Sequence, residues 1–310
     1  MSVDSLIARI TQLQNPTVVG LDPNPDAMPP HLLEQSKGDN PFERAANAVT
    51  AMNYALIDAL CDIVPAVKPQ LACYEQLRHE GVKAFYDTVR YAKQRGMFVI
   101  ADAKRGDIGS TCDYYANAFL GDVALFGERQ PAFDADALTV NPYLGSDGLS
   151  PFVKRCDAFD KMIFVLAKTS NPSSGEFQDR TLEDAPLYEQ VGKAVHALGE
   201  GRVGAHGYSS VGAVVGATYP AQLAALRSAL PHTFFLVPGY GAQGGGAQDA
   251  AAAFDKKGLG AIVNSSRGIL CAWSKRKLDG TAFAAAAREE ALLMREDLLA
   301  AIGHPIGEER

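Results

Sequence analysis

One pattern recurs eight times along the chain: a short apolar run rich in strand-forming residues, a polar or glycine-containing loop, and an amphipathic stretch. Strands that alternate with helices in this way are typical of a parallel sheet. The eight runs occupy residues 17–22, 66–72, 98–104, 137–144, 162–170, 213–218, 234–241 and 261–268. Eight such units in 310 residues predict an α/β fold, a (β/α)8 TIM barrel. A doubly wound open sheet is the alternative.

The segments between these runs are rich in Ala, Leu, Glu and Gln, which favour helices. We expect helices over residues 41–61, 74–95, 111–126, 147–155, 186–198, 221–230 and 247–256. A last helix has Thr281 as its expected N-cap and ends at Gly303. Segments 24–39 and 171–185 carry Pro, Ser and Gly, and we expect them to be insertions in a single barrel domain that spans residues 1–310.

Charge and composition exclude several classes of partner. The formal net charge is −7, whereas nucleic acid and anionic membranes are bound by basic surfaces. No apolar run approaches the length of a membrane span, and the N-terminus lacks the features of a signal peptide. The five cysteines are scattered without a CxxC pair, and no His/Cys cluster has zinc-ligand spacing. The sequence therefore predicts a cytoplasmic protein with no structural metal that binds neither nucleic acid nor membrane.

Charged residues gather where the run at 98–104 ends. Successive side chains of a strand alternate between its faces, so Asp102 and Lys104 are expected to share one face. Asp107 follows after Gly106, which suits a turn, and brings a second carboxylate near the same end of the strand. A solvated strand end with a surface ion pair is the alternative interpretation.

In a barrel of this kind the chemistry lies at the carboxyl ends of the strands. The residues expected there are mostly polar, although packing alone would favour apolar ones. They are Asp22, Lys68, Asp102, Lys104, Asn141, and the segments 168–171, 238–243 and 264–268. This coincidence favours a functional role for Asp102 and Lys104.

The last two strand ends predict a phosphate site. Segment 239–244 matches the spacing GxGxxG, but a dinucleotide fingerprint belongs in the first βαβ unit and requires a later acidic residue. This chain has Asn264 and Ser265 at the corresponding place. The loops after strands seven and eight of a barrel often cradle a phosphate with backbone N–H groups, and Arg267 adds a bidentate cation. A flexible loop with a surface arginine is the alternative.

Taken together, these motifs resemble the orotidine 5'-monophosphate decarboxylase family. DAKRGDIGST at 102–111 is similar to the family signature DxKxxD. The resemblance extends through LDPNP, VKPQ, KTSNPS, PGYGAQGG and NSSRGI at the first, second, fifth, seventh and eighth strands. The chain length and the TSNP and NSSRG sequences are similar to those of the longer, divergent bacterial branch of the family. It implies a carboxy-lyase that converts orotidine 5'-monophosphate to uridine 5'-monophosphate (UMP) in the last step of UMP biosynthesis. It further implies a homodimer that uses no cofactor and no metal.

The resemblance also implies a role for each matching residue. Lys68, Asp102, Lys104 and Asp107 would form a charged catalytic array, in which Lys104 donates a proton and Asp107 reaches the neighbouring subunit's site. The implied substrate-binding residues are Asp22 and Lys68 at the ribose hydroxyls, Thr111 at the same hydroxyls from the partner chain, Ile108 around the base, Ser170 at the pyrimidine edge, Pro238 beside the leaving carboxylate, Gln243 towards the phosphate, and Arg267 paired with the phosphate.

The chemistry explains why these residue types are needed. Loss of CO₂ from C6 leaves a carbanion in the ring plane, where the carbonyl groups cannot delocalise it, so a fixed ammonium group must stabilise and then protonate it. Two other hypotheses stay open. Related sugar-phosphate decarboxylases and aldolases resemble DxKxxD but use Mg²⁺, although Ser170 and Gln243 count against them. A catalytically silent barrel that senses a phosphorylated ligand is the second.

Overall fold

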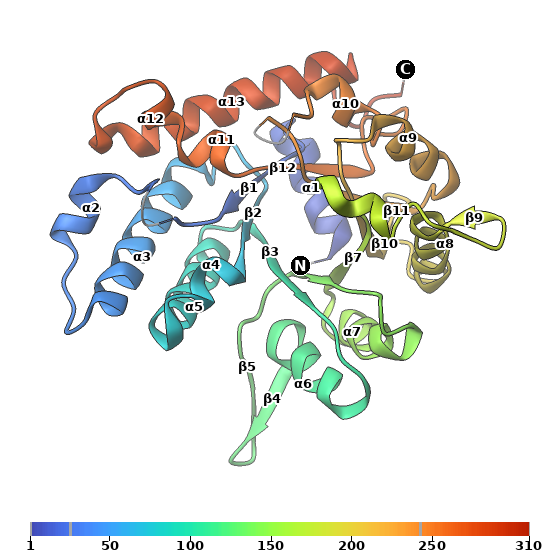
Figure 1. Cartoon of the computed structure of the whole chain (residues 1–310), viewed down its shortest axis with the longest axis horizontal. Coiled ribbons are helices and arrows are strands. Elements are labelled where there is room, and N and C mark those ends of the chain that lie inside the picture. The colour runs from blue at the N-terminus through green and yellow to red at the C-terminus, as the bar shows by residue number, and fades with distance from the viewer. Residues whose placement is uncertain (1, 25–26, 242–243, 310) are drawn as a thin grey trace.

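The computed structural model describes residues 2–24, 27–241 and 244–309. Eight parallel strands close into a barrel in the order β1-β12-β11-β10-β7-β6-β3-β2 (Figure 1). They are β1 (Thr17–Leu21), β2 (Ala66–Pro69), β3 (Phe98–Arg105), β6 (Ala137–Val140), β7 (Met162–Lys168), β10 (Ser209–Val215), β11 (Thr233–Val237) and β12 (Ala261–Ser265). Each expected run overlaps one of these strands, although β10 begins four residues before the run expected at 213–218. The predicted barrel is therefore confirmed and the open sheet is wrong.

Helices surround the barrel strands (Figure 1). They are α1 (Val3–Leu13), α2 (Pro30–Gln35), α3 (Pro41–Leu60), α4 (Leu71–Glu75), α5 (Arg78–Gln94), α6 (Gly109–Leu120), α7 (Ser146–Phe159), α8 (Leu187–Gly199), α9 (Pro220–Ala229), α10 (Ala247–Ala251), α11 (Arg267–Leu270), α12 (Ala272–Lys275) and α13 (Phe283–Ile302). Among these described helices, none has the length and apolar composition needed to cross a membrane.

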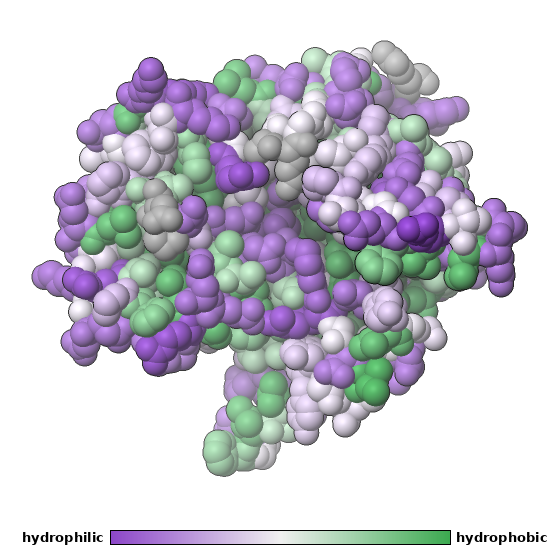
Figure 2. Space-filling view, in the orientation of Figure 1, coloured by the Kyte–Doolittle hydropathy of each residue, from purple (hydrophilic) through white to green (hydrophobic). Residues whose placement is uncertain are grey.

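The helix expected over 111–126 is wrong in its last part. α6 ends at Leu120, and β4 (Asp122–Leu125) then pairs antiparallel with β5 (Glu128–Pro131). Phe126 and Gly127 form the two-residue turn, both with positive φ (53° and 87°), which is the conformation that tight hairpins require. This β4–β5 hairpin projects away from the barrel in Figure 1, and its apolar tip is green in Figure 2.

Other helix boundaries also differ from expectation: α7 runs to Phe159 instead of residue 155, and α10 ends at Ala251 instead of residue 256. The single helix expected over 74–95 is divided into α4 and α5, because Arg78 at the junction has a φ of 63°. Thr281 is not the N-cap of α13: it lies in a 3₁₀ turn (Gly280–Ala282), where the Asp279 carboxylate accepts a hydrogen bond from its backbone N–H. The expected end of α13 at Gly303 is confirmed, since Gly303 has the left-handed backbone of a C-cap.

An apolar cluster fills the barrel interior, and α1 closes one end of the barrel. Val3, Leu6, Ile7 and Ile10 of α1 pack with buried side chains of the barrel strands, and Ile306 near the C-terminus joins them. In Figure 1, α1 lies behind the strands at the centre of the barrel. A second cluster fills the space between the strands and the outer helices. The opposite end of the barrel, where the strands' carboxyl ends lie, is therefore the end left for a site.

Candidate active site

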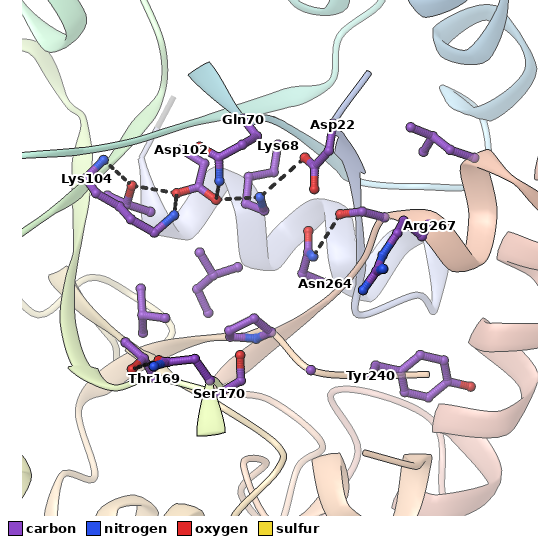
Figure 3. Close-up of a pocket in the computed structure, with 18 of the residues that line it drawn as sticks. Asp22, Lys68, Gln70, Asp102, Lys104, Thr169, Ser170, Tyr240, Asn264 and Arg267 are labelled. Carbon is purple, nitrogen blue, oxygen red and sulfur yellow. Dashed lines mark hydrogen bonds and ion pairs between the residues drawn. The ribbon is translucent and has the colours of Figure 1, made fainter. Parts of the chain in front are cut away.

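A cavity of about 650 Å³ opens at the carboxyl ends of the barrel strands (Figures 2 and 3). This volume is within the range of small-molecule sites, about 300–1,000 Å³. Its floor is apolar, because Val214 and Leu236 belong both to the cavity wall and to the barrel's interior cluster. Its walls carry the charged and polar side chains of several strands, which the hollow in Figure 2 shows as hydrophilic.

Asp102 lies at the centre of the charged wall and is only 6% exposed. Its Oδ2 accepts hydrogen bonds from Lys68 Nζ at 2.6 Å and from Gln70 Nε2 at 2.9 Å. Its Oδ1 accepts from Lys104 Nζ at 2.6 Å (Figure 3). The same Oδ1 accepts from Thr139 Oγ1 at 2.9 Å. The four donors come from β2, β3, β6 and the residue that follows β2. Together they occupy each of the four acceptor positions of one carboxylate.

The pKa of Asp102 lies well below its usual value. Burial by itself would raise that pKa, but the ammonium groups of Lys68 and Lys104 outweigh burial through their charge and their hydrogen bonds. Burial likewise would lower the pKa of Lys68, yet Asp102 and Asp22 raise it above the ordinary value. Both partners are therefore charged at neutral pH, and Lys68 Nζ also lies 3.9 Å from Asp22 Oδ1.

Lys104 reaches the cavity through an irregular backbone. Its φ is 48°, a left-handed value that L side chains rarely adopt, and its N–H donates to Thr139 Oγ1 at 2.9 Å. The expectation that Asp102 and Lys104 lie together is confirmed, but regular strand alternation is not the cause. The Lys104 side chain is 45% exposed, against 5% for Lys68, so the ammonium group that faces the open cavity is that of Lys104.

The other expected site residues differ in where they lie. Asp22, Ser170, Pro238 and Arg267 line the cavity, and Arg267 begins α11 directly after β12. Asp107, Ile108 and Thr111 follow β3 and do not line the cavity of their own chain; Ile108 and Thr111 are exposed. Gln243 lies outside the described residues.

Residues 18–277 match the family model described as Orotidine 5'-phosphate decarboxylase / HUMPS family. The chain belongs to this family. An orotidine 5'-phosphate decarboxylase of Rhodopirellula baltica is 44% identical over 297 residues, which cover 94% of this chain and 97% of the relative. One of Caldicellulosiruptor bescii is 40% identical over 272 residues, 87% and 89% of the two chains.

Solved structures agree with this membership of the orotidine 5'-phosphate decarboxylase family. The structure of Leishmania donovani OMP decarboxylase is 32% identical and superposes with a TM-score of 0.70, covering 96% of this chain and all of that one. The resemblance inferred from the sequence motifs is thus confirmed for the family and for the fold.

Two polar residues in this family member's cavity were not singled out from the sequence. Gln70 and Thr139 both donate to Asp102, but neither is charged, and the sequence interpretation relied on charged residues. The signal for Gln70 is its spacing, two residues beyond Lys68 in VKPQ, which puts both side chains on one side of the chain. Thr139 lies in an otherwise apolar run and has no comparable signal.

Two residues lie at the carboxyl ends of their strands, as expected, but do not line the cavity. Asn141 is exposed and outside the cavity lining, and its Oδ1 accepts from the Tyr143 N–H in the following turn. Lys168 is fully buried away from the cavity, where its Nζ donates to Asp179 Oδ1 at 2.7 Å and to Ser174 Oγ at 3.2 Å. It therefore anchors the segment after β7, which contains a 3₁₀ turn (Pro172–Glu176), to the barrel.

Among residues 2–24, 27–241 and 244–309, no group of three or more His, Cys, Asp or Glu side chains is arranged to hold a metal ion. The chemistry at Asp102 also disfavours a cation, because protein donors occupy both of its oxygens and two of them are ammonium groups. The charged wall of this family member is instead arranged as alternating carboxylate and ammonium groups.

Proposed function

We propose that this chain decarboxylates orotidine 5'-monophosphate to uridine 5'-monophosphate and CO₂, the last step of UMP biosynthesis. Family membership supports the reaction, and one observation in the structure carries the mechanism. That observation is an ionised, buried Asp102 that holds the Lys104 ammonium group at the wall of a nucleotide-sized cavity. The reaction needs no electron-accepting cofactor if this ammonium group supplies the stabilisation.

The C6–carboxylate bond breaks and leaves its electron pair on C6 as CO₂ departs. That pair lies in the ring plane and is not delocalised into the carbonyl groups, so its charge must be balanced by a charge outside the ring. Lys104 Nζ provides that positive charge and then transfers a proton to C6, after which it regains a proton from water. Stabilisation by a preoriented charge requires no reorganisation during the reaction, and each factor of ten in rate corresponds to about 1.4 kcal/mol.

Asp102 and Lys68 keep Lys104 charged and oriented before the substrate arrives. Asp102 binds Lys104 directly, and Lys68 binds the other oxygen of the same carboxylate. Asp22 lies 3.9 Å from Lys68 Nζ, so the two carboxylates and the two ammonium groups of this wall balance in charge. The Lys104 ammonium group is the more exposed of the two, and its positive charge favours above all the transition state in which negative charge gathers at C6.

The remaining cavity residues are proposed to place the nucleotide. Asp22 and Lys68 hold the ribose hydroxyls; Asp22 Oδ1 has no hydrogen-bond partner among the described residues and can accept one from a hydroxyl. Ser170 reads the pyrimidine edge and Pro238 lines the pocket beside the leaving carboxylate. Arg267 pairs with the phosphate. Gln243 retains its proposed role towards the phosphate, outside the described residues.

We further propose that the chain acts in the cytoplasm as a homodimer. Asp107, Ile108 and Thr111 lie beyond the cavity of their own chain, and Ile108 is 56% exposed. A second copy that packs against this part of α6 would cover Ile108 and would receive Asp107 and Thr111 into its own site. Each active site would then be completed by the neighbouring chain.

The metal-dependent sugar-phosphate enzymes are the less favoured alternative. In that chemistry the carboxylates of the array must offer lone pairs to Mg²⁺. Asp102 offers none, since Lys68, Gln70, Lys104 and Thr139 occupy both of its oxygens.

The test is the ultraviolet spectrum of orotidine 5'-monophosphate mixed with the purified protein in excess EDTA, followed until it stops changing. Conversion to the spectrum of uridine 5'-monophosphate is the expected result and would establish the reaction and its independence of metal together. Lys104→Ala, which is expected to leave the fold intact, serves as the inactive control. An unchanged spectrum, with or without added Mg²⁺, would refute the proposal.

A further inference from the structure

The hydroxyl of Thr139 lies between the backbone of Lys104 and the carboxylate of Asp102. Thr139 Oγ1 accepts a hydrogen bond from the Lys104 N–H at 2.9 Å and lies 2.9 Å from Asp102 Oδ1. The residue is 1% exposed, in the middle of β6, and its side chain forms part of the cavity wall. One buried hydroxyl thus contacts the two residues that determine where the Lys104 ammonium group lies.

The pairing of β3 with β6 explains why a side chain is needed there. Ala101 is paired with Leu138 and Arg105 with Val140, so β3 advances four residues while β6 advances two. The extra residues form a bulge, and a bulge leaves backbone groups without ladder partners while it redirects side chains. The Lys104 N–H lies inside this bulge and is satisfied by the Thr139 hydroxyl in place of a backbone carbonyl.

The direction of both hydrogen bonds follows from chemistry. Asp102 is ionised and can only accept, so the single hydroxyl proton of Thr139 must be donated to Asp102 Oδ1. The Lys104 N–H then donates to a lone pair of the same hydroxyl. Lys104 Nζ donates to that same Oδ1, which closes a ring from the Lys104 backbone through Thr139 and Asp102 to the Lys104 ammonium group.

We infer that Thr139 is a positioning residue for the reaction: it holds the left-handed backbone of Lys104 and the carboxylate that orients its ammonium group. The inference rests on the proposed decarboxylase function. Thr139 itself transfers no proton. Without its hydroxyl, the bulge loses the partner of the Lys104 N–H and Asp102 loses one of four donors. Lys104 can then relax from its φ of 48°, and its ammonium group moves relative to C6.

The experiment compares Thr139→Val, Thr139→Ser and Thr17→Val in the full chain. Valine has the shape of threonine without the hydroxyl, whereas serine keeps the hydroxyl. Thr17 is the matched control, because it is also a buried barrel threonine but its hydroxyl has no hydrogen-bond partner among the described residues. Steady-state kcat and KM are measured with orotidine 5'-monophosphate, and binding of uridine 5'-monophosphate is measured by calorimetry.

Thr139→Val is expected to lower kcat roughly 10- to 100-fold, the effect of displacing a reacting group by about an ångström, with KM and product affinity unchanged. Thr139→Ser should restore most of kcat, and Thr17→Val should keep all of it. If Thr139→Val folds poorly by circular dichroism, Thr139→Ala replaces it, since alanine adds no bulk.

Wild-type kcat in the variant without the hydroxyl would overturn the inference, as would an equal loss in Thr17→Val or a failure of serine to restore activity. A rise in KM with kcat unchanged would also overturn it, because it would assign Thr139 to binding. Failure of the wild-type chain to convert the substrate is a different result, and it would refute the proposed function itself.

Discussion

Lys68 and Lys104 offer a direct comparison, because both ammonium groups bind the same carboxylate at 2.6 Å but differ in exposure. We expect Lys68→Met and Lys104→Met both to abolish turnover, and only Lys68→Met to destabilise the fold strongly. The substitution is the same at both positions and keeps the unbranched side chain, so the difference reports the environment of each charge.

The expected magnitudes follow from burial. At 2.6 Å, two unit charges attract by about 6 kcal/mol at an effective dielectric constant of 20 and by about 1.6 kcal/mol at that of water. Lys68, 5% exposed, is near the first case. Removing the Lys68 charge also removes the cost of desolvating it. Even so, breaking a buried ion pair typically lowers the free energy of unfolding by about 3–5 kcal/mol. Lys104, 45% exposed, is near the second case, and its loss should cost about 1 kcal/mol or less.

Urea unfolding followed by circular dichroism measures both free energies. Lys83→Met is the matched surface control, since Lys83 pairs with Asp87 at 2.6 Å on α5 and its side chain is 75% exposed. That control should change stability by less than about 0.5 kcal/mol. A Lys104→Met protein as unstable as Lys68→Met, or a Lys68→Met protein as stable as the control, would refute the assignment of these energies to burial.

Three further predictions concern Asp102, the segment after β7 and the proposed homodimer. Lys68 and Lys104 lower the pKa of Asp102 by more than burial raises it. The Asp102 carboxylate therefore stabilises the fold at neutral pH, and this stabilisation should be lost progressively as the pH falls below about 4. Asp102→Asn should flatten that part of the pH dependence in urea titrations, and an unchanged slope would contradict it. Asp179→Asn should loosen the segment held by Lys168 and raise KM up to about tenfold, with a smaller change in kcat; steady-state kinetics would show whether kcat falls instead. Inactive Asp107→Ala and Lys104→Ala proteins, mixed in equal amounts under conditions that exchange subunits, should recover about one quarter of wild-type activity, since half of the dimers would carry one native site. No recovery in mixed dimers would place Asp107 in its own chain's site.

Most of the barrel could be predicted from the sequence because its strands are buried on both faces and read as apolar runs. The β4–β5 hairpin could not, because all four residues of β5 are exposed and carry no core pattern. Its turn also depends on a phenylalanine at positive φ, whereas the usual sequence signal for such a turn is Asn-Gly or Asp-Gly.

The charged residues of the site could be recognised because they interrupt apolar runs, but their neighbours depend on how strands meet. Thr139 contacts Asp102 only because of the bulge between β3 and β6. Lys168 shows the opposite case. Regular alternation would put it beside Leu166 in the cavity wall, but the register of β7 with β10 shifts between Leu166 and Lys168. That shift turns the Lys168 side chain away, and no local pattern in the sequence announces it.

The helix that closes the barrel also affects the strength of the charges in the site. α1, the interior cluster and the apolar cavity floor form one continuous column, so bulk water cannot approach Asp102 and its lysines from beneath. Water would screen those charges, and its exclusion keeps the local dielectric constant low. No residue of α1 lines the cavity, yet this first helix of the chain keeps water away from the charged groups that do.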